Sequence, residues 1–507
     1  MVAAPVSPAP IHSPMPITTL RHPLPSLACA FIASGILLAG GASAATLHVD
    51  AGLASGANDG SSWDNAYQGP GGLAAALAAA SSGDEIWVKA GVHKPTTGTT
   101  RTISFTLKSG VAIYGGFAGG ETAVDQRDPV ANVTILSGDL LGNDPTITDN
   151  SYHVVRGGSA NATAILDGFT ITAGNANGPQ AQDNDRGGGI LMITASNGTI
   201  RDCVFVGNRC TFGGGAGYVR SSSPTFDGCR FENNLGGSFG GAFDCFQNCN
   251  PTFLDCVFTG NSAARAGALE FFQNCQPKLT NCVIWNNTAT GTGGGGAMFL
   301  ANSSVATVRN CTIAGNKANQ LVGGILNNSS TVSLGNSIVW SNSGPGGTVT
   351  AGQQVTNQSG GTTTATYSTI QFGFAGTGNN GTDPLFVDFA GGDLHVGASS
   401  PAIDSGNNAL VPVGVLTDLD GNPRFVDDPA TADTGAGTPP LVDRGAYEVQ
   451  APPPCPADLD GNGVVDGGDL GSLLAGFGGA GPGDLDGSGT IDGGDLGILL
   501  AAWGDCP

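Results

Sequence analysis

The chain has 507 residues, of which 40% are hydrophobic and only 11% are charged, and it contains 84 glycines. This composition favours a folded protein of stacked strands and turns over a disordered chain or a helical bundle. The formal net charge of −22 repels nucleic acid and anionic membrane surfaces, so we expect no nucleic-acid partner.

The first 44 residues have the pattern of an export signal. Arg21 precedes an apolar stretch over residues 27–38, and the Ala-Ser-Ala tripeptide at 42–44 offers small residues for cleavage. No later run approaches the roughly 18 apolar residues of a membrane-spanning helix. We therefore expect a secreted protein without a transmembrane anchor once the signal has been removed.

The segment after the signal predicts a short helix that covers one end of a core. Residues 71–82 are Gly-Gly-Leu-Ala-Ala-Ala-Leu-Ala-Ala-Ala-Ser-Ser, and an open end of stacked strands is an edge that needs covering. Around this helix stand Leu-His-Val-Asp at 47–50, Gly-Ser-Ser-Trp at 60–63 and Asp-Glu-Ile-Trp-Val-Lys-Ala-Gly at 84–91. These sequences resemble the opening of bacterial right-handed parallel β-helix proteins of the pectate-lyase-like superfamily.

An internal repeat occupies the middle of the chain. A cysteine recurs at intervals of 26, 27, 26 and 29 residues, an asparagine stands five residues after each one, and a glycine forms a third column. A repeat of this length, with short apolar alternations and no helical period, predicts the coils of an all-β parallel β-helix. The columns are Cys203, Cys229, Cys256, Cys282, Cys311 and Ser337; Asn208, Asn234, Asn261, Asn287, Asn316 and Asn342; and Gly215, Gly241, Gly267, Gly296 and Gly324.

Stacking places the residues of each column directly above one another, because neighbouring strands lie about 4.8 Å apart. We expect the asparagines to form a hydrogen-bonded ladder at a sharp turn. The column cysteines lack metal-binding spacing, so we expect them to be reduced and buried in the core. Cys249 and Cys275 both end the sequence Phe-Gln-Asn-Cys in an expected turn, where an inter-coil disulfide is an alternative.

Four further residues form a candidate glycan site. Asp244 and Glu270 each stand three residues after a column glycine, and Tyr218 and Phe299 have the same place one coil before and one coil after. Strand alternation turns these side chains outward, which predicts a carboxylate pair between two aromatic platforms. Retaining glycosidases use carboxyl groups about 5 Å apart, and repulsion raises one pKa towards that of a general acid. The alternative is a carboxylate pair on a solvated sheet with no catalytic role.

The next region contains Asp-Pro-Leu-Phe-Val at 383–387, Ser-Ser-Pro-Ala-Ile-Asp-Ser-Gly at 399–406 and Asp-Arg-Gly-Ala-Tyr-Glu at 443–448. It is similar to the choice-of-anchor Q region that closes many bacterial β-helices. Asp418, Asp420 and Asn422 carry oxygen ligands but lack a later acidic partner at the expected spacing, so they predict a structural turn. The Ala-Pro-Pro-Pro sequence at 451–454 predicts a stiff linker.

Two tandem loops at the C-terminus have the spacing of calcium-binding loops. Each has oxygen-bearing side chains at positions 1, 3, 5, 9 and 12, with glycine at position 6, where the chain turns sharply. Residues 455–507 hold nine aspartates and no basic residue, so we expect this segment to fold only with calcium. The predicted ligands are Asp458, Asp460, Asn462, Asp466 and Asp469 in the first loop and Asp484, Asp486, Ser488, Asp492 and Asp495 in the second.

Both loops end in Asp where an ordinary EF-hand has Glu, and one helix is expected after each, over 470–477 and 496–503. Duplicated half EF-hands of this kind resemble dockerins. The resemblance implies a cohesin-like domain or a cell-surface scaffold as partner, although a calcium-stabilised terminal cap without a partner is the alternative. Cys455 and Cys506 bracket the module and predict a disulfide.

Three classes of function remain open: a polysaccharide lyase or glycoside hydrolase, a non-catalytic carbohydrate-binding adhesin, and a structural envelope protein. β-Helices host all three, so the fold does not choose among them. Polysaccharide is the expected ligand and calcium the expected cofactor. The predicted organisation is a signal peptide at 1–44, a capped β-helix at 45–380, a closing region at 381–450, a linker at 451–454 and a dockerin-like domain at 455–507.

Overall fold

The computed structural model describes residues 44–450 and 455–506. All but the last residue of the predicted signal peptide, and the predicted linker, lie outside these ranges. The chain divides into two compact units, residues 1–449 and 450–507. Within the described ranges no helix has the length and apolar character needed to cross a membrane.

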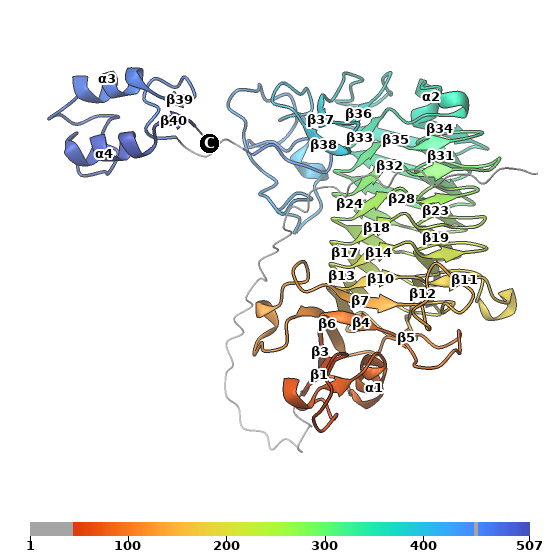
Figure 1. Ribbon diagram of the computed structural model, residues 1–507. Helices are drawn as coiled ribbons and strands as arrows, with labels where there is room; N and C mark the ends of the chain where they lie inside the picture. The colour runs from red at the N-terminus through yellow and green to blue at the C-terminus, as the bar shows by residue number, and fades with distance from the viewer. Residues whose placement is uncertain (1–43, 451–454, 507) are drawn as a thin grey trace, which may run out of the picture. The chain divides into compact units, whose positions relative to one another are not determined.

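The first unit is a stack of coils whose strands form three parallel sheets (Figure 1). The 12-stranded sheet contains, in spatial order, β2 (Tyr67–Gln68), β1 (Thr46–Asp50), β3 (Glu85–Lys89), β6 (Ala112–Phe117), β9 (Ile165–Asp167), β13 (Thr199–Arg201), β17 (Thr225–Asp227), β20 (Thr252–Leu254), β24 (Lys278–Thr280), β28 (Val305–Arg309), β32 (Thr331–Gly335) and β35 (Thr362–Thr366). The 10-stranded sheet contains β36 (Thr369–Ile370), β33 (Ile338–Trp340), β29 (Thr312–Ala314), β25 (Val283–Trp285), β21 (Val257–Thr259), β18 (Arg230–Glu232), β14 (Val204–Val206), β10 (Thr170–Thr172), β7 (Thr134–Ser137) and β4 (Gly91–His93).

A 9-stranded sheet forms the third side of the stack and positions the candidate glycan site. It contains β34 (Val355–Gln358), β31 (Ile325–Asn328), β27 (Met298–Ala301), β23 (Leu269–Phe272), β19 (Phe243–Phe246), β16 (Gly217–Arg220), β12 (Ile190–Ile193), β8 (Val155–Arg156) and β5 (Phe105–Thr106). Shorter strands are β11 (Asn175–Ala176), β15 (Arg209–Cys210), β22 (Ser262–Ala263), β26 (Thr288–Ala289), β30 (Lys317–Ala318) and the antiparallel pair β37 (Phe386–Asp388) and β38 (Asp393–Val396). The helical segments are α1 (Gly72–Ala79), α2 (Ala351–Gln354) and the 3₁₀ turns Trp63–Asn65, Val124–Gln126, Gln180–Gln182, Pro345–Gly347 and Asn408–Leu410.

The predicted asparagine ladder is confirmed. From Asn234 onward, each amide oxygen accepts hydrogen bonds from the backbone and side-chain nitrogens of the asparagine one coil earlier; for Asn261 accepting from Asn234, both distances are 3.0 Å. The Asn261 side chain in turn donates to Phe231 O at 2.8 Å and to Asn287 Oδ1 at 2.9 Å. The last rung, Asn342, bonds to the buried Gln354 side chain of α2. The ladder therefore satisfies buried backbone groups at every bend.

A continuous apolar core fills the space between the three sheets. Aromatic rings stack from coil to coil, as where Phe231 lies 5.2 Å from Phe205 and 4.8 Å from Phe258 between ring centroids. The five column cysteines are buried and unpaired, as expected. Helix α1 contributes Leu73 and Leu77 to the same core, which confirms its predicted place at the N-terminal end of the stack (Figure 1).

The alternative of a disulfide between Cys249 and Cys275 is not supported. Both residues are unpaired, fully buried members of the core. Gln247 and Asn248 take left-handed backbone conformations, with φ of 65° and 56°, and this bend returns Cys249 to the interior. Each thiol donates to a main-chain carbonyl, as Cys249 does to Val219 at 3.2 Å. These two cysteines thus behave like the column cysteines.

The region expected to close the β-helix packs along its flank. Leu394, Leu419 and Ala446 form an apolar cluster with Val257 and Val283 on the outer face of the 10-stranded sheet. Hydrogen bonds join the two parts, for example from Asn281 Nδ2 to Thr417 O at 2.8 Å and from Ala446 N to Thr312 Oγ1 at 3.1 Å. The region covers the flank because the 10-stranded sheet carries apolar residues on its outer face as well as on its inner face, and the outer ones need to be buried.

The second unit has a small apolar core of Ala457, Val465, Leu473, Ile491 and Leu499. Its elements are β39 (Val464–Val465), β40 (Gly504–Asp505), α3 (Gly467–Ala475) and α4 (Gly493–Ala501). The helices follow the two aspartate-rich loops as expected, but each begins three residues earlier than predicted. The predicted disulfide is present, with 5.9 Å between the Cα atoms of Cys455 and Cys506.

Candidate functional site

The predicted stack of side chains on the 9-stranded sheet has the expected register. Asp244 of β19 pairs with Glu270 of β23, Tyr218 precedes Asp244, and Phe299 follows Glu270. Their strand neighbours, such as Phe243, point into the core, so alternation turns the four side chains away from it. The sequence alignment therefore placed these residues correctly along the coils.

These outward side chains do not lie on a solvated surface, so the alternative of a carboxylate pair on a solvated sheet is wrong. Asp244 and Glu270 are only 3% and 1% exposed. The segment before each strand folds back over the sheet, and the backbone of Gly213 lies so close to the Asp244 carboxylate that a methyl group would not fit between them. The glycine-rich loops of neighbouring coils therefore form a roof over the carboxylate pair.

Arg265 covers the Glu270 end of the carboxylate pair. Its guanidinium forms a two-pronged ion pair with the Glu270 carboxylate, in which the Nε donates at 3.1 Å. Burial and the neighbouring Glu270 raise the pKa of Asp244 well above its usual range. Burial also raises the pKa of Glu270, while Arg265 opposes that shift. The arrangement favours a protonated Asp244 beside an ionised Glu270 that Arg265 neutralises.

Tyr218 is not the aromatic platform that was expected. Its side chain is fully buried, and its hydroxyl lies 3.1 Å from Arg186 Nη1. Arg186 lies over the Tyr218 ring at 4.9 Å and pairs with Asp185 at 2.9 Å. This second arginine therefore covers the other end of the stack, and because the Tyr218 ring is fully buried it offers no face to a sugar.

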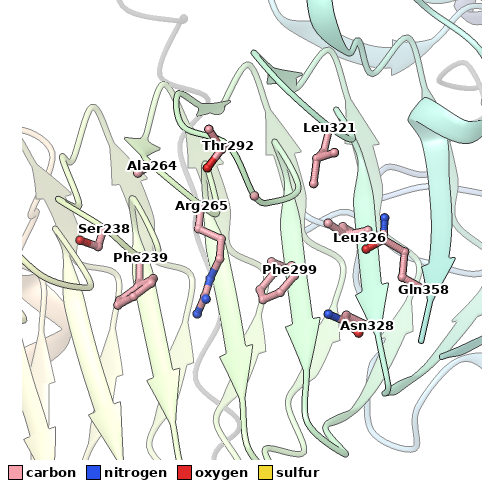
Figure 2. Close-up of a pocket in the computed structure, with 11 residues that line it drawn as sticks. Ser238, Phe239, Ala264, Arg265, Thr292, Phe299, Leu321, Leu326, Asn328 and Gln358 are labelled. Carbon is pink, nitrogen blue, oxygen red and sulfur yellow. The ribbon is translucent and has the colours of Figure 1, made fainter. Parts of the chain in front are cut away.

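An open groove of about 500 Å³ lies over the opposite end of the stack. Phe239, Arg265 and Phe299 lie side by side across neighbouring coils, and Leu326 and Gln358 continue the wall (Figure 2). The Arg265 guanidinium lies 4.2 Å from the centroid of the Phe239 ring and 4.8 Å from that of Phe299. Phe299 thus lines this groove, although only 6% of it is exposed.

Sequence reasoning missed Phe239 and Arg265, which contribute most to the character of this groove. Both stand two residues before a column glycine, at Gly241 and Gly267. That shared offset was a usable signal, because residues at one offset in successive coils lie side by side in a β-helix. The groove therefore combines two aromatic rings, a guanidinium and amide side chains.

The two aspartate-rich loops form the candidate metal sites of the second unit. Asp458, Asp460 and Asp469 each place a carboxylate oxygen within 4.8 Å of the others. In the second loop Asp484, Asp486 and Asp495 do the same. An all-oxygen donor set of this kind fits calcium.

The remaining predicted ligands of the first loop have other contacts. Asp466 caps α3 by accepting a hydrogen bond from Gly468 N at 2.7 Å, and Asn462 accepts one from Val464 N at 2.9 Å. Asp492 and Ser488 have the corresponding roles in the second loop. Of the four aspartates predicted as ligands in each loop, the structure brings the carboxylates of three within 4.8 Å of one another.

The closing region contains the structural turn that the sequence predicted. Asp418 accepts hydrogen bonds from the backbone nitrogens of Asp420 and Asn422. Asp420 then lies 2.7 Å from His395 Nε2, while Asp393 lies 2.6 Å from its Nδ1. Burial alone would lower the pKa of His395, but the hydrogen bonds with Asp420 and Asp393 outweigh it and raise the pKa to about 9. These contacts explain the turn without a bound ion.

Known proteins share limited similarity with this chain. None of the curated proteins matches the chain at a significant level. Among solved structures, the pectate lyase Pel9A is similar at 14% identity over 80% of this chain and 96% of its own, with a TM-score of 0.42. A rhamnogalacturonan lyase is similar at 12% identity over 68% and 91%, with a TM-score of 0.40. Residues 141–294 match the family model of the right handed beta helix region, and the first unit is accordingly a right-handed parallel β-helix.

Proposed function

We propose that the chain is a secreted, carbohydrate-binding β-helix protein that binds a polysaccharide along the groove at Arg265. The groove composition carries this proposal, since aromatic rings pack against the apolar faces of sugars while guanidinium and amide groups bond to hydroxyls. Phe239 is partly exposed beside Arg265, and it takes the role of platform that the sequence assigned to Tyr218. The groove crosses several coils, which suits an extended chain of sugars.

Binding without cleavage is favoured by the position of the carboxylates. A general acid or base must come within hydrogen-bonding distance of the reacting group, and Asp244 and Glu270 lie beneath Arg265 and the glycine-rich roof. Hydrolysis or lyase chemistry at this pair requires Arg265 to move away from Glu270. The second candidate is therefore a glycoside hydrolase or lyase, supported by the in-register carboxyl pair and the raised pKa of Asp244.

The second unit serves as the attachment module in this proposal. We infer that its loops bind two calcium ions through the clustered carboxylates, and that the module binds a cohesin-like domain or cell-surface scaffold, as the dockerin resemblance implies. Leu474, Phe477 and Leu500 are exposed apolar side chains in and beside its helices, and such residues are suited to a partner surface. The export signal predicted at residues 1–44 would bring the protein to the cell exterior.

Binding to a panel of acidic and neutral glycans tests the groove. We expect retention of at least one polysaccharide, and an affinity loss of about tenfold on Phe239→Ala, because one aromatic contact is removed. Phe372→Ala is the matched control, since that ring is 57% exposed elsewhere on the unit. Failure of the parent protein to bind any glycan would contradict the proposal.

The same assays separate binding from catalysis. New reducing ends or unsaturated products from the parent protein would favour the enzyme, provided that Asp244→Asn and Glu270→Gln each abolish them in variants that remain folded. Cleavage that persists in the double variant would eliminate this pair as catalytic groups. Binding without products supports the proposal as stated.

A further inference from the structure

Three aspartates converge in the closing region of the first unit, outside the C-terminal loops. Asp404, Asp427 and Asp433 each place a carboxylate oxygen within 4.8 Å of the others. Asp404 is fully buried, whereas the other two are exposed. The cluster therefore has a buried wall and an open side that solvent reaches.

The buried wall carries an oxygen without a hydrogen-bond partner. Asp404 Oδ2 accepts from the backbone nitrogen of Asp428 at 3.2 Å, but Asp404 Oδ1 is buried and has no partner among the described residues. A buried carboxylate oxygen in this state carries an uncompensated desolvation penalty. A cation bound by the Asp404 carboxylate would offset this penalty.

Main-chain hydrogen bonds hold the cluster together despite the repulsion between its charges. The carbonyl oxygen of Asp404 accepts from the backbone nitrogens of Thr434 and Gly435, both at 3.0 Å. The backbone nitrogen of Asp404 donates to Asp443 Oδ1 at 2.7 Å. Together with the bond from Asp428, these contacts fix both ends of the loop at 427–435 against Asp404, so the three carboxylates are pre-arranged.

The basic side chains of this region are bonded elsewhere. Arg424 lies 3.7 Å from Glu448 and donates to the carbonyl oxygens of Gly445 and Ala446, while Arg444 donates to the carbonyl oxygen of Ser405. Within the residues that the structure describes, no basic side chain forms an ion pair with the three clustered aspartates. Their negative charge is therefore not balanced by the protein.

We propose that Asp404, Asp427 and Asp433 form a third cation site, which binds calcium. Calcium takes six to eight oxygen ligands in flexible geometry, and the open side of the cluster lets water complete the shell. The bound ion would fasten the loop at 427–435 to Asp404, and through it the covering region that packs on the flank of the β-helix. The site is independent of the glycan groove and of the second unit.

Counting bound ions in the full chain tests the proposal. The background variant carries Asp458→Asn, Asp460→Asn, Asp484→Asn and Asp486→Asn, so that the C-terminal loops no longer contribute. Equilibrium dialysis against calcium should find one ion per chain in this background. Adding Asp427→Asn and Asp433→Asn should remove it, whereas adding Asp125→Asn, at an exposed aspartate outside the cluster, should not. Both substituted cluster residues are exposed, so the fold should survive, which circular dichroism checks.

Amide hydrogen exchange provides a second measurement. Calcium should slow exchange at residues 427–435 in the background variant and in the Asp125→Asn control, but not after the Asp427→Asn and Asp433→Asn substitutions. Absence of a bound ion in the background variant would overturn the proposal. An unchanged count and unchanged protection in the cluster variant would overturn it equally.

Discussion

The β-helix unit and the C-terminal unit achieve order by opposite means. The first stacks a long apolar core and neutral amide ladders through many coils, and its stability follows from burial. The second buries five apolar side chains around two clusters of aspartates and one disulfide. A core of that size rarely stabilises a fold without staples or metal ions. The comparison shows that a repeated coil gains a large apolar core, whereas we expect a small acidic module to depend on bound calcium.

Removing calcium should have the largest effect, and it should be confined to the second unit. In chelator the aspartates of each loop repel one another, so we expect α3 and α4 to lose their helical structure. Hydrogen exchange on the full chain measures this directly: amides of both helices should lose protection, while those of the β-helix strands serve as the internal control. Full protection of α3 and α4 in chelator would remove the contrast between the two units.

Opening a cavity in the aromatic stack should have the next largest effect, this time in the first unit. Phe231 is fully buried between Phe205 and Phe258, so Phe231→Ala should cost about 3–5 kcal/mol of unfolding free energy. Phe372→Ala, at an exposed ring, is the control and should cost little. Denaturant unfolding measures both, and a small loss for Phe231→Ala would mean that the coils tolerate gaps in the core.

Breaking one rung of the amide ladder should cost somewhat less. Asn261→Ala removes the acceptor for two hydrogen bonds from Asn234 and the donor to Phe231 O and Asn287 Oδ1. Because these groups are buried, we expect a loss of about 2–3 kcal/mol. Asn319→Ala changes an exposed asparagine of the same unit and should be almost neutral. Equal losses of unfolding free energy in the two variants would show that the ladder does not stabilise the fold.

The smallest effect concerns the charged contacts of the closing region. The pKa of His395 is raised to about 9 from its usual value of 6.5, so its ion pairs stabilise the folded state fully below about pH 6.5. This contribution is lost as the pH rises through 9. Because His395 is partly exposed, solvent screening reduces it to about 1 kcal/mol. His395→Gln should abolish this step in stability between pH 6 and 10, and an unchanged pH profile would contradict the assignment.

Much of the first unit could be predicted because a parallel β-helix converts sequence intervals into spatial register. The columns at Asn261 and Cys256, and the pairing of Asp244 with Glu270, required only an alignment of the coils. The disulfide between Cys455 and Cys506 could also be predicted from the sequence. The same holds for the aspartate spacing of the terminal loops. In each case the positions of the residues follow from neighbouring residues in the sequence or from a repeat at a nearly constant interval.

The coil fold, the ladders and the order of residues along each sheet face thus follow from the repeat. Which outward side chains meet solvent could be learned only from the folded chain, because that depends on how loops fold back over the strands. The roof at Gly213 and the ion pair of Arg265 bury the carboxylates that alternation alone would have exposed. The convergence of Asp404 with Asp427 and Asp433 was hidden for the same reason, since a non-repeating loop brings these residues together and no interval in the sequence records it.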